Sequence, residues 1–415
     1  MTNLAPRRGW NWPIRLGQAN GTLALVVMIA QVIVATQSAQ AQTYKVLYSF
    51  TGGADGRTPI AGLVGDAAGN LYGTTVDGGD PTCDLNPGCG TVFKLDTSGT
   101  ETVLHTFTWA DGTHPVAALV RDASGNLYGT TIWGGDSTCY VPYGCGTVFK
   151  VDTTGKYTVL HTFTGGADGV GPEADLIRDA AGNLYGTTYQ GGASDRGTVF
   201  KLDTSGAERV RHIPGAHPAG ALVRDAAGSV YGTTVYGGTS NVGTVFKLDT
   251  SGTGTVLHTF TGGVDGAYPY EGLVRDAAGN LYGIAYNGGD LTCNVPFGCG
   301  TVFEVDTTGK YTVLHTFTGG ADGAHPWAAL VRDAAGSLYG LTVTGGPSDA
   351  GTVFKLDTTG KETVLYSFSG GTDGGNPYGS LVRDAERNLY GTTAHGGITG
   401  GACRDGCGVV FKLTP

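Results

Sequence analysis

Seven copies of one pattern run from Tyr44 to Pro415, and this repetition constrains the fold more than any other feature of the chain. Each copy contains a Leu/Val-Tyr-Gly step, and the tyrosines of these steps lie 46 to 57 residues apart: Tyr72, Tyr128, Tyr185, Tyr231, Tyr282, Tyr339 and Tyr390. The copies consist of short runs rich in β-branched and aromatic residues, without helical periodicity. A repeat of this length built from such runs is typical of an array of β-sheet blades.

Each copy contains four predicted strands separated by turn residues. We call them strands A to D; in the second copy they are residues 117–122, 126–132, 146–152 and 157–163. The A–B and C–D connections are short polar turns, in which a glycine supplies the positive φ. Four antiparallel strands per copy form the unit of a propeller. The predicted fold class is therefore an all-β, seven-bladed β-propeller with four antiparallel strands in each blade.

The first and last strands are out of phase with the repeat. A lone D-type run occupies residues 44–50, before the first strand A, and the seventh copy stops after its strand C at residues 409–413. We therefore expect the N-terminal strand to complete the last blade as its outermost strand. Such an arrangement closes the ring and leaves no incomplete terminal blade.

Residues 1–41 differ in composition from the repeats. Three arginines precede an apolar run at residues 23–35, and small side chains follow at Ala39 and Ala41. These are the parts of a secretory signal peptide, and the apolar run is short for a membrane span. We expect this segment to be removed and residues 42–415 to form a single propeller. An uncleaved N-terminal anchor is the alternative.

The charge balance argues against a nucleic-acid partner. The chain has a formal net charge of −10, and loss of Arg7, Arg8 and Arg15 with the N-terminal segment would make it −13. Since phosphate backbones need a basic surface, we interpret the acidity as a solubility feature of an exported protein. No second apolar run is long enough for a membrane span. We expect a monomer that is secreted, periplasmic or held at the surface of a bacterial cell.

Eight cysteines form four close pairs, all in the segment between strands B and C. The pairs are Cys83/Cys89, Cys139/Cys145, Cys293/Cys299 and Cys403/Cys407. This segment is 10 residues long in the four copies with cysteines and 4 residues long in the other three. We expect the long loops to lie outside the core, where a local disulfide would stabilise each by roughly 2–3 kcal/mol. Zinc is the alternative, but these spacings are not those of the usual zinc knuckles, and two pairs would have to meet.

The recurring lines Gly-Asn-Leu-Tyr-Gly-Thr-Thr, Gly-Thr-Val-Phe-Lys-Leu-Asp and Thr-Val-Leu-His-Thr-Phe-Thr-Gly-Gly resemble the exported bacterial tandem-repeat family called GloVer (Gloeobacter/Verrucomicrobia repeats). The resemblance implies a propeller-like secreted or surface protein and no established activity. Members carry C-terminal anchors, which we do not expect here because Pro415 directly follows a strand C. The Asp-x-x-Gly-Asn-Leu-Tyr segment is also similar to NHL-type propellers, at the level of the fold alone.

Residues that recur from blade to blade are expected to serve the scaffold. Arg-Asp pairs end strand A in six copies, and we expect them to cap turns and pair blades. One register of strand D holds only His or Tyr, which indicates packing: Tyr48, His105, His161, His258, His315 and Tyr366. Asp-Gly steps recur in the D–A loops, at Asp55, Asp111, Asp168, Asp265, Asp322 and Asp373. We expect these aspartates to form turns and the protein to need no cofactor; Ca²⁺ held by their carboxylates is the alternative.

Positions that differ between copies are the best candidates for function. The A–B and C–D turns share one face of the ring, so the longer B–C and D–A loops share the other, where a binding site is expected. Beside the D–A proline and before the Gly-Gly step, these loops carry aromatic and hydrogen-bonding side chains that suit a sugar or a peptide. The predicted ligand-binding residues are His114, Trp133, His217, Tyr236, Tyr268, Tyr270, His325, Trp327, Tyr378 and His395.

We therefore expect an exported propeller that binds an extracellular ligand, in first place a carbohydrate, without catalysis. No catalytic residue is assigned, because the sequence has no Gly-x-Ser-x-Gly, His-Glu-x-x-His or P-loop motif. Two alternatives stay open. One is a propeller that displays its loops to a protein partner. The other is a lyase or lactonase-type enzyme with a metal at the channel mouth, near acids such as Glu173, Asp175 and Glu271.

Overall fold

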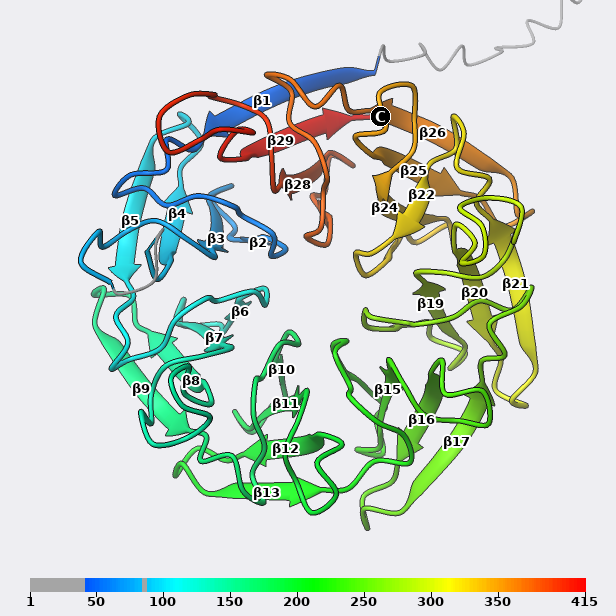
Figure 1. The fold of residues 1–415 in the computed structure, drawn as a ribbon, viewed down its shortest axis with the longest axis horizontal. Helices are drawn as coiled ribbons and strands as arrows, with labels where there is room; N and C mark the ends of the chain where they lie inside the picture. Colours follow the sequence, from blue (N-terminus) through cyan, green and yellow to red (C-terminus); the bar gives the residue numbers. More distant parts are fainter. Residues whose placement is uncertain (1–41, 84–87) are drawn as a thin grey trace, which may run out of the picture. The chain divides into compact units, whose positions relative to one another are not determined.

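A computed structural model describes residues 42–83 and 88–415, which form seven antiparallel sheets around a central axis (Figure 1). The fold predicted from the repeats is confirmed, because the described part of the chain is all-β and its sheets are the seven blades of a propeller. The predicted signal peptide, residues 1–41, lies outside the described residues. Within the described ranges, no helix is long and apolar enough to cross a membrane.

Each blade contains strands A to D from the axis outwards, and blade 6 has one additional short strand. Blades 1 to 3 contain β2 (Val64–Gly65), β3 (Leu71–Thr75), β4 (Thr91–Leu95) and β5 (Glu101–Thr106); β6 (Val120–Arg121), β7 (Leu127–Thr131), β8 (Thr147–Val151) and β9 (Tyr157–Thr162); β10 (Ile177–Arg178), β11 (Leu184–Thr188), β12 (Thr198–Leu202) and β13 (Glu208–Arg211). Blades 4 and 5 contain β14 (Val223–Arg224), β15 (Val230–Thr234), β16 (Thr244–Leu248) and β17 (Gly254–Thr259); β18 (Val274–Arg275), β19 (Leu281–Ala285), β20 (Thr301–Val305) and β21 (Tyr311–Thr316). Blades 6 and 7 contain β22 (Ala324–Pro326), β23 (Val331–Arg332), β24 (Leu338–Thr344), β25 (Thr352–Leu356) and β26 (Glu362–Ser367); β27 (Val382–Arg383), β28 (Leu389–Thr393), β29 (Val409–Thr414) and β1 (Thr43–Ser49).

The alternation of side chains along each strand gives every blade two faces. In blade 1, Leu71 pairs with Leu95 and Tyr72 pairs with Lys94. The two leucines pack against blade 7, and the tyrosine packs toward blade 2. The buried apolar side chains form seven clusters, each between two neighbouring blades. The hydrophobic core is therefore distributed over the interfaces between blades.

A pair of phenylalanines crosses six of the seven interfaces. The phenylalanine after strand D meets the one in strand C of the next blade edge to face, as in Phe107 and Phe149, whose ring centroids are 5.2 Å apart. The other pairs have centroid distances of 5.1 to 5.4 Å: Phe50–Phe93, Phe163–Phe200, Phe260–Phe303, Phe317–Phe354 and Phe368–Phe411. The glycine of the Leu-Tyr-Gly step gives the strand-C ring its space, since a Cβ on Gly73 would lie 2.7 Å from the Phe93 ring.

The repeated Arg-Asp pair and the tyrosine of the Leu-Tyr-Gly step act together. Asp66 accepts hydrogen bonds from the Asn70 N–H at 2.9 Å and from the Tyr72 hydroxyl at 3.0 Å, which closes the A–B turn. The Arg121 guanidinium of blade 2 stands over the Tyr72 ring, 6.0 Å from its centroid. Equivalent contacts occur at four further interfaces: Arg178–Tyr128, Arg224–Tyr185, Arg332–Tyr282 and Arg383–Tyr339. The predicted roles in turn capping and in pairing of blades are confirmed.

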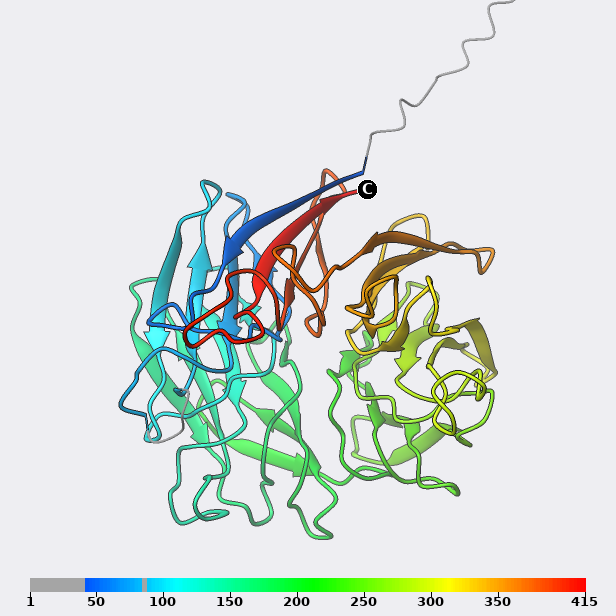
Figure 2. The same ribbon diagram turned by 45° about the horizontal axis from the view of Figure 1, so that its top comes forward.

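The N-terminal strand closes the ring as predicted. β1 pairs antiparallel with β29, from Thr43 opposite Thr414 to Ser49 opposite Val409, and the two strands lie side by side in Figures 1 and 2. Blade 7 is therefore composed of the first described strand of the chain and its last three. Phe50, the residue after β1, is fully buried against blade 1. The same segment thus completes blade 7 and seals the interface between blades 7 and 1.

All four predicted disulfides are present, with Cα–Cα distances of 5.0 to 5.9 Å: Cys83–Cys89, Cys139–Cys145, Cys293–Cys299 and Cys403–Cys407. They also support the neighbouring loops. The carbonyl oxygen of Cys89 accepts a hydrogen bond of 3.1 Å from the His114 N–H, and that of Cys299 accepts one of 2.8 Å from the His325 N–H. Each stapled B–C loop is therefore hydrogen-bonded to the D–A loop that leads into the next blade.

The position of the disulfides differs from the expectation that the long loops lie outside the core. The second cysteine of every pair is buried, with an exposed fraction of 0% to 1%: Cys89, Cys145, Cys299 and Cys407. Cys145 belongs to the same core cluster as Phe163, and Cys407 to the same cluster as Phe50. The reason is that this cysteine stands two residues before strand C, where the loop has already entered the blade. These cysteines therefore pack in the core as well as closing the loops.

Replacing Phe50 by alanine should lower the free energy of unfolding by about 3–5 kcal/mol, because a fully buried ring is lost at the closing interface. Chemical denaturation followed by tryptophan fluorescence measures this change. Val264→Ala is the control, since this side chain is 78% exposed. Its expected effect is below about 0.5 kcal/mol. Similar effects of the two substitutions would contradict the role assigned to the closing segment.

Candidate ligand-binding face

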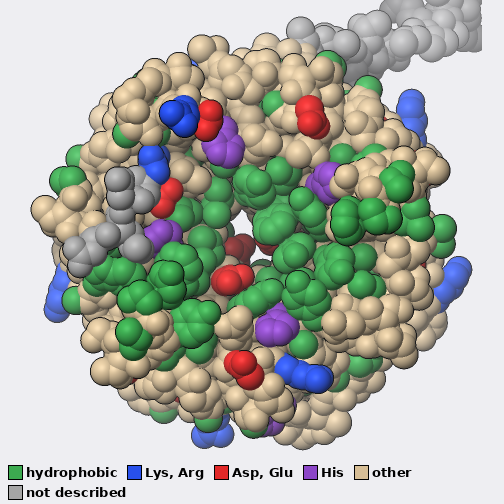
Figure 3. Space-filling view, in the orientation of Figure 1, with side chains coloured by type: hydrophobic (Ala, Val, Ile, Leu, Met, Phe, Trp, Pro, Cys, Tyr) green, Lys and Arg blue, Asp and Glu red, His purple; other side chains and the backbone are tan. Residues whose placement is uncertain are grey.

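The B–C and D–A loops lie on one face of the ring, which is the face seen in Figure 3. Hydrophobic and histidine side chains surround the central opening of this face, with a few acidic side chains among them. In every copy a backbone bridge joins the D–A loop to the end of strand B, as between Thr113 and Trp133 or Ala216 and Tyr236. The bridge brings the two sets of variable positions next to each other.

The residue before the D–A proline has a left-handed backbone conformation in every copy, with φ between 51° and 65°. Glycine and asparagine adopt this conformation most readily, yet only Gly171 and Asn376 of the seven residues are of these types. The other five are Thr58, His114, His217, Tyr268 and His325. Strained backbone that is retained in a chain with 74 glycines indicates that the side chains themselves matter at these positions.

Nine rings on this face form a continuous series of contacts that we call the aromatic arc: Tyr189, His217, Tyr236, Tyr268, Tyr270, Tyr286, His325, Trp327 and Tyr378. Tyr270 stacks on Trp327 with 4.6 Å between ring centroids and an interplanar angle of 17°. The other neighbouring rings have centroid distances of 4.8 to 6.5 Å. All nine side chains are only partly buried, so each keeps some surface open to a ligand.

Seven of the ten predicted ligand-binding residues belong to the arc: His217, Tyr236, Tyr268, Tyr270, His325, Trp327 and Tyr378. His114 and Trp133 form a separate group, in which the Trp133 ring lies 4.7 Å from His114 and 5.2 Å from Tyr143. His395 is exposed, and its Nδ1 lies 3.2 Å from Asn376 Oδ1. The structure therefore places the predicted residues in one large group, one small group and one separate position.

Two members of the arc were missed by sequence reasoning. Tyr189 and Tyr286 lie two residues before the first glycine of the Gly-Gly step. The predicted residues of strand B, such as Tyr236, lie one position later, directly before this glycine. The other copies have valine, isoleucine or alanine at this position, as at Val76 and Ala394. An aromatic residue in place of a small aliphatic one was the signal that could have identified them.

Three acidic residues follow the D–A prolines of blades 3 and 5 beside the arc. Burial raises the pKa of Glu173 to about 7. Burial, followed by the nearby Tyr236 and Glu173, also raises the pKa of Tyr189. Burial also raises the pKa of Asp175 and of Glu271, and the nearby Asp175 raises the pKa of Glu271 further. Asp175 accepts a hydrogen bond of 2.6 Å from the Ala118 N–H of the neighbouring blade. Glu173 therefore offers a carboxyl group beside the arc that can donate as well as accept hydrogen bonds near pH 7.

The aspartates of the D–A loops form turns, as predicted. Asp55 accepts hydrogen bonds from the Thr51 N–H at 2.8 Å and from the Thr51 hydroxyl at 2.6 Å. The same pair of contacts recurs at Asp168 and Asp322. These carboxylates fix the shape of the loops that carry the arc.

A family model described as the Gloeobacter/Verrucomicrobia repeat matches the chain at residues 32–138, 82–297 and 291–415. The chain belongs to this repeat family. The resemblance noted in the sequence is therefore confirmed, and it covers all seven blades. Among curated proteins, none matches this Gloeobacter/Verrucomicrobia repeat protein in sequence.

Two solved structures with similar architecture are extracellular domains from B. thetaiotaomicron. The first comes from a protein assigned as a hybrid two-component system; it is 12% identical, with a TM-score of 0.54, and the match covers 90% of this chain and 41% of that one. The second comes from a protein assigned as a one-component system; it is 10% identical, with a TM-score of 0.56, and the match covers 88% and 39%. The repeat protein spans about two fifths of the length of these two chains. At these identities the likeness shows the fold alone.

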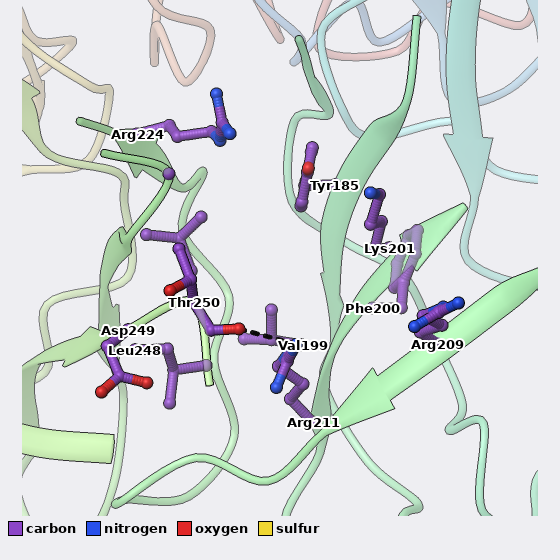
Figure 4. A pocket seen from close by; sticks show the side chains of 12 residues that line it. Tyr185, Val199, Phe200, Lys201, Arg209, Arg211, Arg224, Leu248, Asp249 and Thr250 are labelled. Atoms are coloured by element: carbon purple, nitrogen blue, oxygen red, sulfur yellow. Dashed lines mark hydrogen bonds between the residues drawn. The ribbon is translucent and has the colours of Figure 1, made fainter. Parts of the chain in front are cut away.

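The Gloeobacter/Verrucomicrobia repeat is interrupted most strongly between blades 3 and 4. Arg211 occupies a register of strand D that holds leucine in the other six copies, and Pro214 replaces the phenylalanine that follows strand D. A cavity of about 220 Å³ opens there, lined by cationic and apolar side chains, among them Lys201, Arg209 and Arg224 (Figure 4). Arg211 donates a hydrogen bond of 3.2 Å to the Thr250 carbonyl oxygen of blade 4. A polar contact thus stands where the other interfaces have apolar packing.

Arg211→Leu should raise the free energy of unfolding by about 1–2 kcal/mol, because it restores the leucine that packs against the core in the other copies and fills part of the cavity. The denaturation midpoint measures the change. Arg209→Thr is the matched control, because threonine is the residue of five other copies at this exposed register. It should alter the stability by less than about 0.5 kcal/mol. A leucine variant no more stable than the control would contradict this account of the interface.

Glu173→Gln should stabilise the protein above neutral pH and have little effect in acid. The pKa of Glu173 is raised from 4.5 to about 7 in the folded protein, so its stabilising contribution is complete below pH 4.5 and is lost as the pH rises through 7. Glutamine stays neutral and avoids this loss. Thermal unfolding of both proteins at pH 4.5, 6 and 8 should show a difference that grows with pH. A constant difference would contradict the raised pKa.

Proposed function

We propose that this repeat protein binds a carbohydrate through the aromatic arc. The observation that supports the proposal most is the arc itself, in which nine rings contact one another and three of them stand on strained backbone, at His217, Tyr268 and His325. Sugar rings have apolar C–H faces that stack on aromatic side chains and hydroxyl groups that need polar partners. Tyr270 and Trp327 offer the stacking surfaces.

The polar partners for sugar hydroxyls lie at the edge of the same arc. Glu173, with a pKa near 7, can donate or accept a hydrogen bond, and the hydroxyls of Tyr189 and Tyr236 can do both. A mixture of rings and uncharged polar groups suits a neutral or weakly charged sugar better than a strongly charged ligand. The chemistry of the face therefore favours a neutral oligosaccharide.

We place this activity outside the cytoplasm. Four local disulfides support export, because disulfides form and persist in oxidising compartments. On this proposal residues 1–41 are removed, and residues 42–415 act as a monomeric single-domain propeller that is secreted, periplasmic or held at the cell surface. The extracellular setting of the two domains from B. thetaiotaomicron lends this some support.

A second candidate function is the binding of a protein partner by the stapled loops. Equivalent positions of the B–C loops in blades 2 and 5 expose large apolar side chains. Val141 and Val295 are both 72% exposed, and Tyr143 and Phe297 are 40% and 58% exposed. Such exposure on two rigid loops favours contact with an apolar protein surface.

A glycan array with the purified protein, followed by calorimetry on the best ligand, tests the first function. Trp327→Ala and Tyr270→Ala should each weaken binding at least about fivefold, because stacking of a ligand on one aromatic ring contributes on the order of 1–3 kcal/mol. Phe297→Ala is the matched control, since it removes an exposed ring from the same face outside the arc. It should leave sugar binding unchanged.

The two functions predict opposite outcomes for these variants. Absence of any bound glycan, or equal loss in the arc variants and in Phe297→Ala, would overturn the carbohydrate proposal. Loss of a partner interaction in Phe297→Ala alone would establish the second candidate.

A further inference from the structure

The outer rim of the propeller repeats a three-residue arrangement at the interfaces between blades. It consists of the strand-D residue at the His/Tyr register, the aspartate of the D–A loop that follows, and the first residue of strand D in the next blade. Four interfaces have histidine as the first member, and the third member is then tyrosine or glutamate: His105/Asp111/Tyr157, His258/Asp265/Tyr311, His161/Asp168/Glu208 and His315/Asp322/Glu362.

The arrangement is closed where the third residue is tyrosine. Tyr157 stacks flat on His105 with 3.7 Å between ring centroids, and its hydroxyl donates a hydrogen bond of 2.7 Å to the Asp111 carbonyl oxygen. His105 Nε2 lies 3.0 Å from Asp111 Oδ2. The interface of blades 4 and 5 is alike, with 3.3 Å between His258 Nε2 and Asp265 Oδ2. The tyrosine ring fills the space, and the histidine contacts the aspartate directly.

The arrangement is open between blades 2 and 3, where Glu208 takes the place of the tyrosine. His161 Nε2 lies 3.6 Å from Asp168 Oδ2 and 3.7 Å from Glu208 Oε2, and one ligand atom of each residue lies within 4.8 Å of the other two. These separations are longer than hydrogen bonds. The three side chains are only 12% to 19% exposed. Glu208 Oε1 and His161 Nε2 are buried without a hydrogen-bond partner among the described residues.

This set of donors has the composition and spacing of a metal site. Bonds from Zn²⁺ to histidine nitrogen and carboxylate oxygen are about 2.0–2.2 Å long, so ligand atoms around a tetrahedral ion lie about 3.4 Å apart. The separations at His161 are close to that value. Two of the three ligands are carboxylates, so a cation between Asp168 and Glu208 would also relieve their mutual repulsion.

We propose that His161, Asp168 and Glu208 bind Zn²⁺ or a similar divalent transition-metal ion. Thr164 orients the aspartate, since its N–H donates to Asp168 Oδ2 and its hydroxyl donates to Oδ1, both at 2.8 Å. The ion joins β9, the loop after it and β13, so it cross-links the outer strands of two blades. Three protein ligands leave a further coordination position for water or an external ligand.

The test uses the tag-free protein, treated with EDTA and then titrated with Zn²⁺ by calorimetry, with bound metal counted after dialysis. We expect one tightly bound ion per chain and a higher thermal midpoint in its presence. Glu208→Tyr introduces the residue of the closed interfaces, and His161→Tyr introduces the residue found at the same register in Tyr48 and Tyr366. Each should weaken binding at least about tenfold, because one of three ligands is lost.

Glu101→Gln is the matched control, because this glutamate occupies the position of Glu208 at an interface with Tyr48 in place of histidine. It should leave the affinity unchanged. The proposal is overturned if the wild-type protein binds no Zn²⁺, or if both tyrosine variants bind it as tightly as the wild type. Loss of the ion in Glu362→Gln, with retention in Glu208→Tyr, would place it at the other interface and would also overturn the proposal.

A second measurement on the wild-type protein covers the case in which a tyrosine variant does not fold. Co²⁺ bound in place of Zn²⁺ should give the intense visible absorption of a four-coordinate site with nitrogen and oxygen ligands. The weak spectrum of six-coordinate Co²⁺ would contradict the site described here.

Discussion

No blade of this propeller can bury its own apolar faces, so each blade depends on its neighbours. The main contact through which neighbouring blades bury each other is the pair of phenylalanines at their interface. The ring after strand D of one blade needs the ring in strand C of the next, and the latter fits only because glycine occupies the Leu-Tyr-Gly step. Stability is therefore shared around the ring rather than held by each copy. This explains why the seven copies have diverged so little in the residues that meet across an interface.

Copies that share one backbone also serve as comparisons for one another. Tyr157 and Glu208 begin equivalent strands, and the first closes a histidine–aspartate pair while the second leaves it open. Arg211 and the leucines of the other copies show the same contrast for packing. Glu208 and Arg211 are the two ends of one short strand, β13, so the outer edge of blade 3 carries the open arrangement at one interface and the replacement of leucine at the other.

The features that could be predicted from the sequence depend on spacing along the chain. The fold follows from the period of the repeat, the disulfides from cysteines a few residues apart, and the closure from the phase of residues 44–50. The features that were missed depend on which residues of different blades meet. His161 was interpreted as a packing residue, because nothing in its own copy shows that Glu208 lies beside it. The burial of Cys145 and the contacts of Tyr189 with the arc likewise exist only after neighbouring blades have packed.

The pairing of β1 with β29 has a consequence for how the molecule is made. β1 precedes and β29 follows all the other described strands along the chain, so the two strands cannot pair until the copies between them have been synthesised. A truncated chain that ends before Val409 leaves β1 without a partner and the apolar face of blade 1 uncovered. The unpaired strand and the exposed face are then susceptible to proteolysis and aggregation. Closure of the ring therefore depends on synthesis through β29, since only then can β1 pair and blade 7 form.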